Sequence, residues 1–226
     1  MLDYLHRHTE LPVPAVLHVC DDLLVLEFVS GDGRFTPESE RHAADLLAEL
    51  HTRSAPSFGF EFDTLIGPLQ QPNPRVASWR EFFREQRLLH MADVAFEAQR
   101  LPLEARRNID KVASRLDDLL DEPPAPSLVH GDVWTGNVLA EGGRITGFVD
   151  PAIYFADSEV ELAFITLFGT FGRDFFERYQ AVRGVREGFF EVRRDLYNLY
   201  PLLTHVRLFG EPYLAQLNRI VGRYAR

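Results

Sequence analysis

The chain has 226 residues, of which 46% are hydrophobic and 26% charged, which excludes a disordered chain and suffices for one domain with a substantial core. Acidic residues outnumber basic ones 34 to 24, so the formal net charge is −10. Because a nucleic-acid groove needs clustered lysine and arginine, this balance argues against a nucleic-acid partner and weakly favours a cationic small molecule.

The N-terminal part is predicted to contain a helix end and two strands. Residues 1–8 are typical of the end of a helix, and the apolar stretches 11–19 and 23–29 are typical of strands. The second stretch is apolar enough to be buried on both faces. Glycines in the run 31–33 then break it, and we interpret them as a flexible exit, because Thr36 stands where a phosphate-binding G-x-G-x-x-G turn needs glycine.

The middle of the chain is predicted to be mainly helical. A Thr-Pro-Glu start and apolar spacing predict a helix over residues 36–51. Residues 54–77, rich in proline and phenylalanine, are interpreted as a long ordered loop. A Ser-x-x-Glu capping box opens a helix over about 78–100, and another helix is expected over about 103–121.

The last part of the chain combines a small hairpin with helices. Residues 138–139 and 145–149 are predicted to be strands around a turn with two glycines, and the chain from Glu159 onward is predicted to be helical and rich in aromatic residues. Two strands, a run of helices, a hairpin and more helices together indicate the α+β class.

The single cysteine and the hydropathy pattern bear on where the protein works. Cys20 has no partner for an intrachain disulfide and is expected to be a small core residue. No run approaches the roughly 20 apolar residues of a membrane helix, and the N-terminal residues lack a basic region followed by an apolar stretch. We therefore expect no membrane partner and a cytoplasmic protein.

The stretch VHGDVWTGNVL (129–139) holds the most informative spacing in the chain. Asn137 follows Asp132 by five residues, and Asp150 comes at the end of the predicted hairpin. Phosphoryl transfer from a nucleotide needs a carboxylate that accepts the proton of the substrate hydroxyl, and an asparagine and a second carboxylate that hold Mg²⁺. These three residues match the spacing of a kinase catalytic loop and its metal-binding aspartate.

The neighbouring residues sharpen this match to one family. HGDVWTGN and DPAIYFADSEVELA (150–163) resemble the fructosamine kinase, or ketosamine kinase, family within the aminoglycoside phosphotransferase and protein-kinase-like superfamily. FGF (58–60), IGPLQQPN (66–73), WREFFREQRLL (79–89) and LLTHVRLFG (202–210) resemble the same family, so the likeness covers nearly the whole chain. It implies phosphorylation, with ATP and Mg²⁺ as cofactors, of a sugar hydroxyl on a glycated amine.

The resemblance implies roles for the residues of the central motif. Asp132 would be the catalytic base, and Asn137 and Asp150 would be the Mg²⁺ ligands. Ala156 and Glu161 depart from the family pattern, which usually has glycine and aspartate there. Both lie outside the implied metal site, so we expect them to affect local packing more than chemistry.

Roles for the nucleotide and the sugar follow from the same resemblance. The backbone of Glu27, Phe28 and Val29 would form the hinge that hydrogen-bonds adenine. Trp134 would lie beside the sugar, where an aromatic face can stack on it, although core packing is an equally good reading. His205 would line the substrate pocket.

Several polar residues have simpler interpretations. His130 is interpreted as a structural histidine that holds the loop through a backbone hydrogen bond. Asp157 and Glu161 lie four residues apart at a predicted helix start, where acidic side chains favour the helix dipole. His51 is expected only to close a helix, and we assign it no function.

Two parts of a kinase nucleotide lobe are missing from the sequence: a glycine-rich turn over the phosphates and a strand lysine. The only lysine is Lys111, on a predicted helix. We therefore expect a protein-kinase-like fold in which residues 1–30 are a remnant of the N-terminal nucleotide lobe and hinge, and residues 31–226 form the mostly helical C-terminal catalytic lobe. Such a loss could leave a weak or inactive kinase, and it would reflect a longer natural protein or an internal start.

Three alternatives stay open at this point. The chain could be another small-molecule phosphotransferase, of the aminoglycoside or choline type. It could instead be a non-catalytic binding protein that keeps the sugar pocket. The third is a metal-dependent hydrolase using His130, Asp132, Asp150 and Asp157. The amine that carries the sugar and the oligomeric state do not follow from the sequence.

Overall fold

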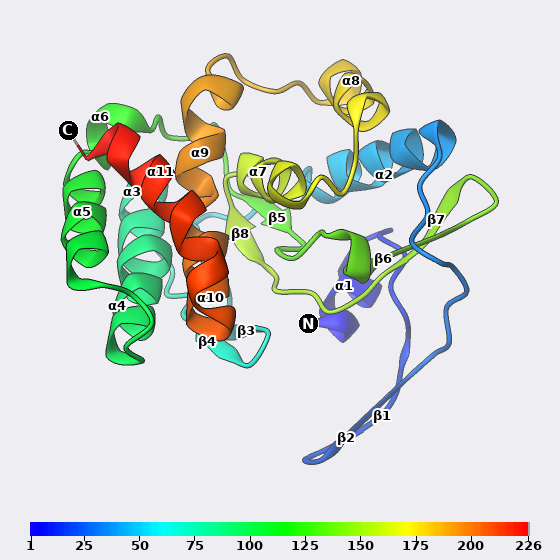
Figure 1. The fold of residues 1–226 in the computed structure, drawn as a ribbon. Coiled ribbons are helices and arrows are strands. Elements are labelled where there is room, and N and C mark those ends of the chain that lie inside the picture. Colours follow the sequence, from blue (N-terminus) through cyan, green and yellow to red (C-terminus); the bar gives the residue numbers. More distant parts are fainter. Residues whose placement is uncertain (226) are drawn as a thin grey trace.

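A computed structural model describes residues 1–225 and shows a mainly helical body with a projecting hairpin (Figure 1). The helices of the first half are α1 (Leu2–His8), α2 (Pro37–Leu50), α3 (Trp79–Phe82), the π-helix η1 (Phe83–Leu89), α4 (His90–Glu97), α5 (Leu103–Ser114) and α6 (Leu116–Leu119). Those of the second half are the 3-10 turn η2 (Thr135–Asn137), α7 (Glu159–Phe168), α8 (Arg173–Val182), the π-helix η3 (Phe189–Arg193), α9 (Arg194–Tyr197), α10 (Leu199–Phe209), the 3-10 turn η4 (Glu211–Tyr213) and α11 (Leu214–Tyr224).

The strands form four separate antiparallel pairs, with no larger sheet among the described residues. The pairs are β1 (Val16–Cys20) with β2 (Leu23–Leu26), β3 (Thr64–Ile66) with β4 (Leu69–Gln71), β5 (Ser127–Val129) with β8 (Tyr154–Ala156), and β6 (Val138–Glu141) with β7 (Arg144–Phe148). The predicted hairpin around residues 142–143 is β6–β7, and its identification is confirmed.

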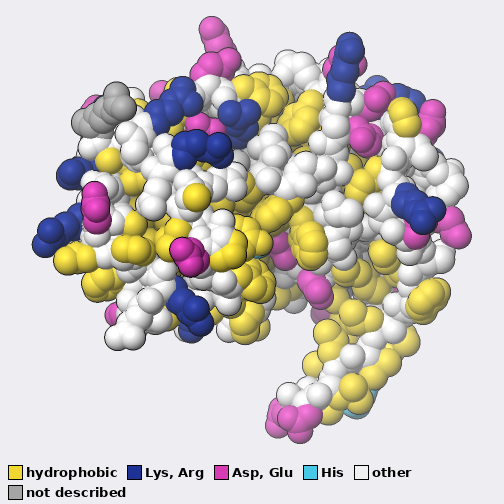
Figure 2. Space-filling view, viewed as in Figure 1, with side chains coloured by type: hydrophobic (Ala, Val, Ile, Leu, Met, Phe, Trp, Pro, Cys, Tyr) yellow, Lys and Arg dark blue, Asp and Glu magenta, His cyan; other side chains and the backbone are white. Residues whose placement is uncertain are grey.

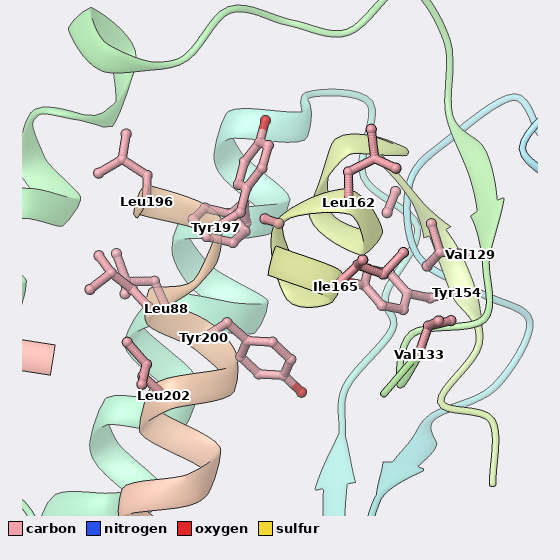
Figure 3. Close-up of a cluster of buried hydrophobic side chains, with 14 of the residues drawn as sticks. Leu88, Val129, Val133, Tyr154, Leu162, Ile165, Leu196, Tyr197, Tyr200 and Leu202 are labelled. Atoms are coloured by element: carbon pink, nitrogen blue, oxygen red, sulfur yellow. The ribbon is translucent and has the colours of Figure 1, made fainter. Parts of the chain in front are cut away.

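One part of the core lies where α7 and α10 meet the strands β5 and β8 (Figure 3). Val129 of β5 and Leu162 of α7 are fully buried in it. Tyr154 of β8 and Tyr200 of α10 are also buried, so their rings complete the packing between strands and helices. Burying this aliphatic and aromatic surface stabilises β5, the strand that leads into the central motif.

Two helix starts follow their predicted capping chemistry with one difference. Thr36 caps α2 through a complete capping box with Ser39. Ser78 accepts a hydrogen bond from Glu81 N at the start of α3, but the second acceptor at this start is Glu122, whose carboxylate accepts from the first helical peptide, Trp79 N, at 2.7 Å. This second acceptor comes from a distant part of the chain.

The predicted elements differ from the structure in three further places. The helix expected over 78–100 is a continuous segment of α3, η1 and α4, with a π-helical middle. The helix expected over 103–121 breaks between α5 and α6 at Arg115. The loop expected over 54–77 contains the short β3–β4 hairpin. Each of its strands has only three residues, and so short a stretch shows no periodicity that would predict a strand.

The prediction that the second strand is buried on both faces is wrong. The β1–β2 hairpin projects from the body, and Figure 2 shows hydrophobic side chains along this arm and acidic ones at its tip. Leu17 and Val19 are 66% and 67% exposed, and Cys20, expected in the core, is also exposed. A two-stranded ribbon has no covering layer unless another element packs on it, and no described element covers these faces.

None of the described helices is both long enough and apolar enough to cross a bilayer.

Candidate active site

The central motif folds into a tight loop, residues 130–137, that connects β5 to β6; we call it the catalytic loop. Gly131 has a φ of +87°, and a β-carbon there would lie 2.3 Å from the carbonyl oxygen of Ala152. The peptide of Ala152 also donates to the oxygen of His130 at 2.8 Å. Glycine is therefore required, because the catalytic loop packs backbone to backbone against the segment that follows Asp150.

Asp132 and Asn137 are brought into direct contact within this loop. The amide nitrogen of Asn137 donates to the Asp132 carboxylate at 2.8 Å and to its backbone oxygen at 3.0 Å. Burial raises the pKa of Asp132 to about 7, with smaller increases from the charges of Asp150 and Glu161 and a decrease from the Asn137 hydrogen bond. A carboxylate whose pKa lies near neutrality can accept a proton at physiological pH.

Asp150 follows β7 and is held in an unusual conformation. Its φ is +50°, in the left-handed region that residues with a side chain seldom adopt. The preceding peptide, Val149, donates to the backbone oxygen of Asn137 at 2.9 Å, which ties the two segments together. Such backbone strain is often found at functional sites.

The oxygen atoms of this site suit a hard cation. The Asn137 amide nitrogen is engaged by Asp132, so its side-chain oxygen is left as an acceptor. The carboxylate of Asp150 is exposed and has no hydrogen-bond or ion-pair partner among residues 1–225. Amide and carboxylate oxygens of this kind are the ligands that Mg²⁺ takes alongside phosphates.

Glu161, in the first turn of α7, anchors the catalytic loop through hydrogen bonds to its backbone. Its carboxylate accepts from Gly131 N at 2.6 Å, from His130 N at 3.1 Å and from the Nε2 of His51 at 3.0 Å. Burial opposes ionisation, but the hydrogen bond and charge of His51, with the other donors, outweigh it and lower the pKa of Glu161. The interpretation of Glu161 as a helix-dipole residue missed this role, and so did the expectation that its departure from the family pattern affects local packing more than chemistry.

His51 is the second residue whose role was missed. It is 1% exposed, and its Nδ1 lies 2.7 Å from the hydroxyl of Tyr179. Because the ionised Glu161 carboxylate only accepts, His51 donates through Nε2, and its Nδ1 then accepts from the Tyr179 hydroxyl when the ring is neutral. A helix-end histidine offers no sequence signal for this chain of contacts, since its partners come from α7 and α8.

A third supporting residue, Gln71, links the loop after Asp150 to α10. Its amide nitrogen donates to the Ala152 oxygen at 3.1 Å, and its amide oxygen accepts from the Tyr200 hydroxyl at 2.8 Å. Gln71 is 1% exposed. Buried polar groups that are fully bonded in this way keep neighbouring segments in one arrangement.

His130 has the structural role predicted for it. The ring is fully buried, and its Nδ1 accepts from the backbone N–H of Asp132 at 3.3 Å. Burial lowers the pKa of His130, against smaller increases from Glu161 and Asp150. A neutral ring is consistent with this acceptor role and with the structural interpretation.

Trp134 and His205 line one groove together with Asp132. This aromatic groove has a volume of about 370 Å³, and its walls include Ile66, Gly67, Phe164, Phe168, Thr204, Leu208, Phe209 and Tyr213. Trp134 is 44% exposed, so the alternative that it is simply a core residue is not supported. Its ring lies against Gly136, where a β-carbon would come within 2.4 Å of the indole.

The imidazole of His205 is oriented by its neighbours. Its Nδ1 lies 2.7 Å from the Pro201 oxygen, which only accepts, so Nδ1 carries the proton and Nε2 is an acceptor when the ring is neutral. Burial lowers the pKa of His205, against the effect of the Pro201 bond. The ring also packs against Phe168, Phe209 and Tyr213, with centroid separations of 4.9, 5.5 and 4.8 Å.

The residues predicted to bind adenine lie just beyond β2. Glu27 N donates to the Ala15 oxygen at 2.9 Å, and the Phe28 side chain is 91% exposed. Val29 packs on Gly147 of β7. Nothing in these contacts tests the adenine hinge, which stays a prediction.

The four residues of the hydrolase alternative do not form one cluster. Asp157 is buried and accepts from the Tyr197 hydroxyl at 2.6 Å and from Arg186. Among residues 1–225, no group of three or more histidine, cysteine or acidic side chains is arranged to hold a metal. The arrangement therefore contradicts a dedicated metal site made of His130, Asp132, Asp150 and Asp157.

Comparisons with known proteins agree on one family. The sequence model described as "Fructosamine kinase" matches residues 1–226. A protein named as a probable ketoamine kinase from Synechocystis is 37% identical over 208 residues, which cover 90% of this chain and 68% of that protein.

Solved structures extend the likeness to three dimensions. A candidate fructosamine-3-kinase from Thermobifida fusca superposes with a TM-score of 0.88 at 36% identity, covering 99% of this chain and 77% of the other. The aminoglycoside phosphotransferase APH(4)-Ia superposes with a TM-score of 0.66 at 19% identity, covering 97% of this chain and 78% of that one. At that identity the second likeness concerns the fold alone.

Proposed function

Because the chain belongs to the fructosamine kinase family, we propose that it transfers phosphate from ATP, with Mg²⁺, to a sugar hydroxyl of a glycated amine. Membership makes it an ATP-dependent small-molecule kinase, and the acceptor and the metal are what the proposal adds. The observation that carries it is the opening of Asp132, with its near-neutral pKa, onto the same groove as Trp134 and His205.

Asp132 would act as the base. Asn137 donates to its Oδ2, which leaves Oδ1 without a partner among residues 1–225 and able to accept the proton of an attacking hydroxyl. Positioning of such a base typically contributes about 10² to 10⁴ in rate. The anchoring of the loop by Glu161 keeps this carboxylate in one place relative to the groove.

Asn137 and Asp150 would hold the metal through the oxygen atoms described above. Bound Mg²⁺ supplies charge neutralisation for the transferring phosphate. The short tie between Val149 and Asn137 keeps the two ligands at a fixed separation, so the site needs little reorganisation on binding.

The sugar would lie between Trp134 and His205. An exposed indole offers a face on which a sugar ring can stack, and the free Nε2 of a neutral His205 can accept from a sugar hydroxyl. Among residues 1–225, no lysine or arginine lines the aromatic groove. A protonated amine next to the sugar can therefore contact aromatic faces and approach Asp132, whereas an anionic substituent finds no counter-charge there.

The nucleotide would lie on the side of residues 1–30. We propose the backbone of Glu27 to Val29 as the adenine hinge, residues 1–30 as the described part of the nucleotide lobe, and residues 31–226 as the catalytic lobe. The packing of Val29 on Gly147 supports the proposed position of the hinge, since β7 ends two residues before Asp150.

The test is phosphate transfer by the purified chain to N-fructosyl-butylamine, with ATP and Mg²⁺, followed by the appearance of a phosphomonoester in ³¹P NMR. The variant Asp132→Asn should lower kcat by at least about 100-fold. Asp121→Asn, an exposed carboxamide replacement outside the groove, is the matched control and should leave the rate unchanged.

Other acceptors separate the remaining readings. Transfer to an aminoglycoside or to choline, but not to the fructosyl amine, would show that the chain is a kinase with a different class of acceptor. Calorimetric binding of the sugar amine without any binding of nucleotide would instead favour a non-catalytic binding protein.

A further inference from the structure

A second hollow lies on the body away from the residues of the aromatic groove, between α7, α9 and α11. We call it the arginine groove; its volume is about 580 Å³, and it is lined by Thr166, Leu167, Arg194, Asp195, Asn198, Gln216, Arg219, Ile220 and Arg223. Figure 2 shows basic side chains gathered over α9 and α11 around an acidic one. A hollow of this size accommodates a small organic ligand.

The charge of the arginine groove is opposite to that of the whole chain. Three arginines and one aspartate leave an excess of two positive charges in a protein whose net charge is −10. Asp195 already pairs with Arg194 at 3.2 Å and with Arg223 at 3.0 Å. Arg219 is exposed and has no ion-pair partner among residues 1–225, so an anion can gain its guanidinium without displacing a protein carboxylate.

One residue of the lining carries unused hydrogen-bonding capacity. Asn198 is 5% exposed, and its side-chain oxygen is buried without a hydrogen-bond partner among the described residues. A buried polar atom left unpaired is unfavourable, so a ligand group that donates to it is favoured. Gln216, beside it, adds a second amide to the lining.

We propose that the arginine groove binds a small phosphate ester that also carries hydroxyl groups, such as a sugar phosphate. Planar guanidinium groups pair with phosphate oxygens through two parallel hydrogen bonds, which gives arginine-lined sites a preference for phosphate over simple halide ions. A hydroxyl group of such a ligand can donate a hydrogen bond to the unpaired side-chain oxygen of Asn198. The site is separate from the proposed kinase groove, and its occupancy does not depend on that function.

The groove is connected to the catalytic machinery through two helices. Thr166 and Leu167 lie on α7, which carries Glu161 in its first turn. Asn198 directly precedes α10, which carries His205. A ligand that fills the groove therefore contacts elements that hold the catalytic loop and the sugar side of the aromatic groove.

Calorimetry on the whole chain at constant ionic strength tests the proposal, with glucose 6-phosphate, inorganic phosphate and glucose as probes. We expect saturable binding of both phosphates, tighter for glucose 6-phosphate, and none for glucose. The double variant Arg219→Gln/Arg223→Gln should weaken binding at least about tenfold, because each charged hydrogen bond is strong. Arg173→Gln, on α8 and 85% exposed in its side chain, is the matched control and should bind as the parent does.

Two further variants sharpen the result. Asn198→Ala should weaken glucose 6-phosphate but not inorganic phosphate, which has no sugar hydroxyl. Asp132→Asn, in the aromatic groove, should leave both unchanged. The absence of saturable phosphate binding, or binding that the Arg219→Gln/Arg223→Gln variant retains or that Asp132→Asn abolishes, would overturn the proposal.

Discussion

The catalytic loop and the β1–β2 hairpin are two short segments that differ in how much of the rest of the protein supports them. Around the loop, the buried carboxylate of Glu161 accepts from two loop peptides and from His51. Along the hairpin, Leu17 and Val19 lie mostly in solvent. One region is supported from several elements, and the other only by its own strand pairing.

The difference shows what holds a functional loop in place. A loop with many backbone turns has few apolar contacts of its own, so its rigidity comes from buried groups on other elements that satisfy its N–H groups. The hairpin has suitable strand residues but no such partner, and its apolar side chains contribute little to the free energy of unfolding. Three changes test this contrast.

The largest effect is expected for Glu161→Ala. It leaves the peptides of His130 and Gly131 and the ring of His51 buried without their acceptor, which should lower the free energy of unfolding by about 3 to 5 kcal/mol. Chemical denaturation in urea measures the loss. In the fraction that remains folded, kcat should fall about 100-fold with little change in KM, because the base is displaced.

Glu161→Asp is the matched control, since it keeps the charge and shortens the side chain by one methylene. It should cost less than half as much stability and recover most of the rate. If Glu161→Ala proved as stable as the parent, the buried carboxylate would not be the support of the loop.

The sequence predicted the local parts of this site and missed the long-range ones. Asn137 and Asp150 flank the β6–β7 hairpin and Asp132 precedes Asn137 by five residues, so local chain geometry brings the three residues near one another. Glu161 and His51 are 110 positions apart, and only the tertiary fold, which brings the residue that ends α2 beside α7, makes them partners. No periodicity carries that information.

The same limit explains the error over the first hairpin. An apolar run of strand-forming residues predicts a strand, and β2 is one, but burial depends on a neighbour that the run does not specify. The cap of α2 was predictable because both members of the box lie within four residues. The second partner of the α3 start, Glu122, was not, because it comes from beyond α6.

An intermediate effect is expected from the pH dependence of Asp132. Burial raises its pKa to about 7 in the folded state, against about 3.9 in an unfolded chain, so folding favours the protonated form. Stability is therefore lost as pH rises from about 4 to about 7. At about 1.36 kcal/mol per pH unit the upper bound is about 4 kcal/mol, and partial exposure reduces it to on the order of 2 kcal/mol.

Asp132→Asn removes this loss, so the variant should be more stable than the parent at pH 8 and nearly equal to it at pH 4. Urea denaturation of both proteins across this range gives the difference curve, with Asp121→Asn as the control whose curve should stay flat. A difference that does not change with pH would contradict the raised pKa. The acid limb of kcat/KM should also reflect this group, since transfer needs the carboxylate ionised.

The smallest effect is expected from the same substitution made once in each region. Val19→Thr, on β1 at 67% exposure, should change the free energy of unfolding by less than about 0.5 kcal/mol, because threonine suits a strand and its hydroxyl stays in water. Val129→Thr, fully buried on β5 directly before the catalytic loop, should cost about 2 kcal/mol, because it buries a hydroxyl. Paired urea curves measure both. Equal losses would mean that the hairpin is packed in solution and that the two regions do not differ in support. A large loss at Val129 alone would show that the stabilising contacts lie beside the catalytic loop.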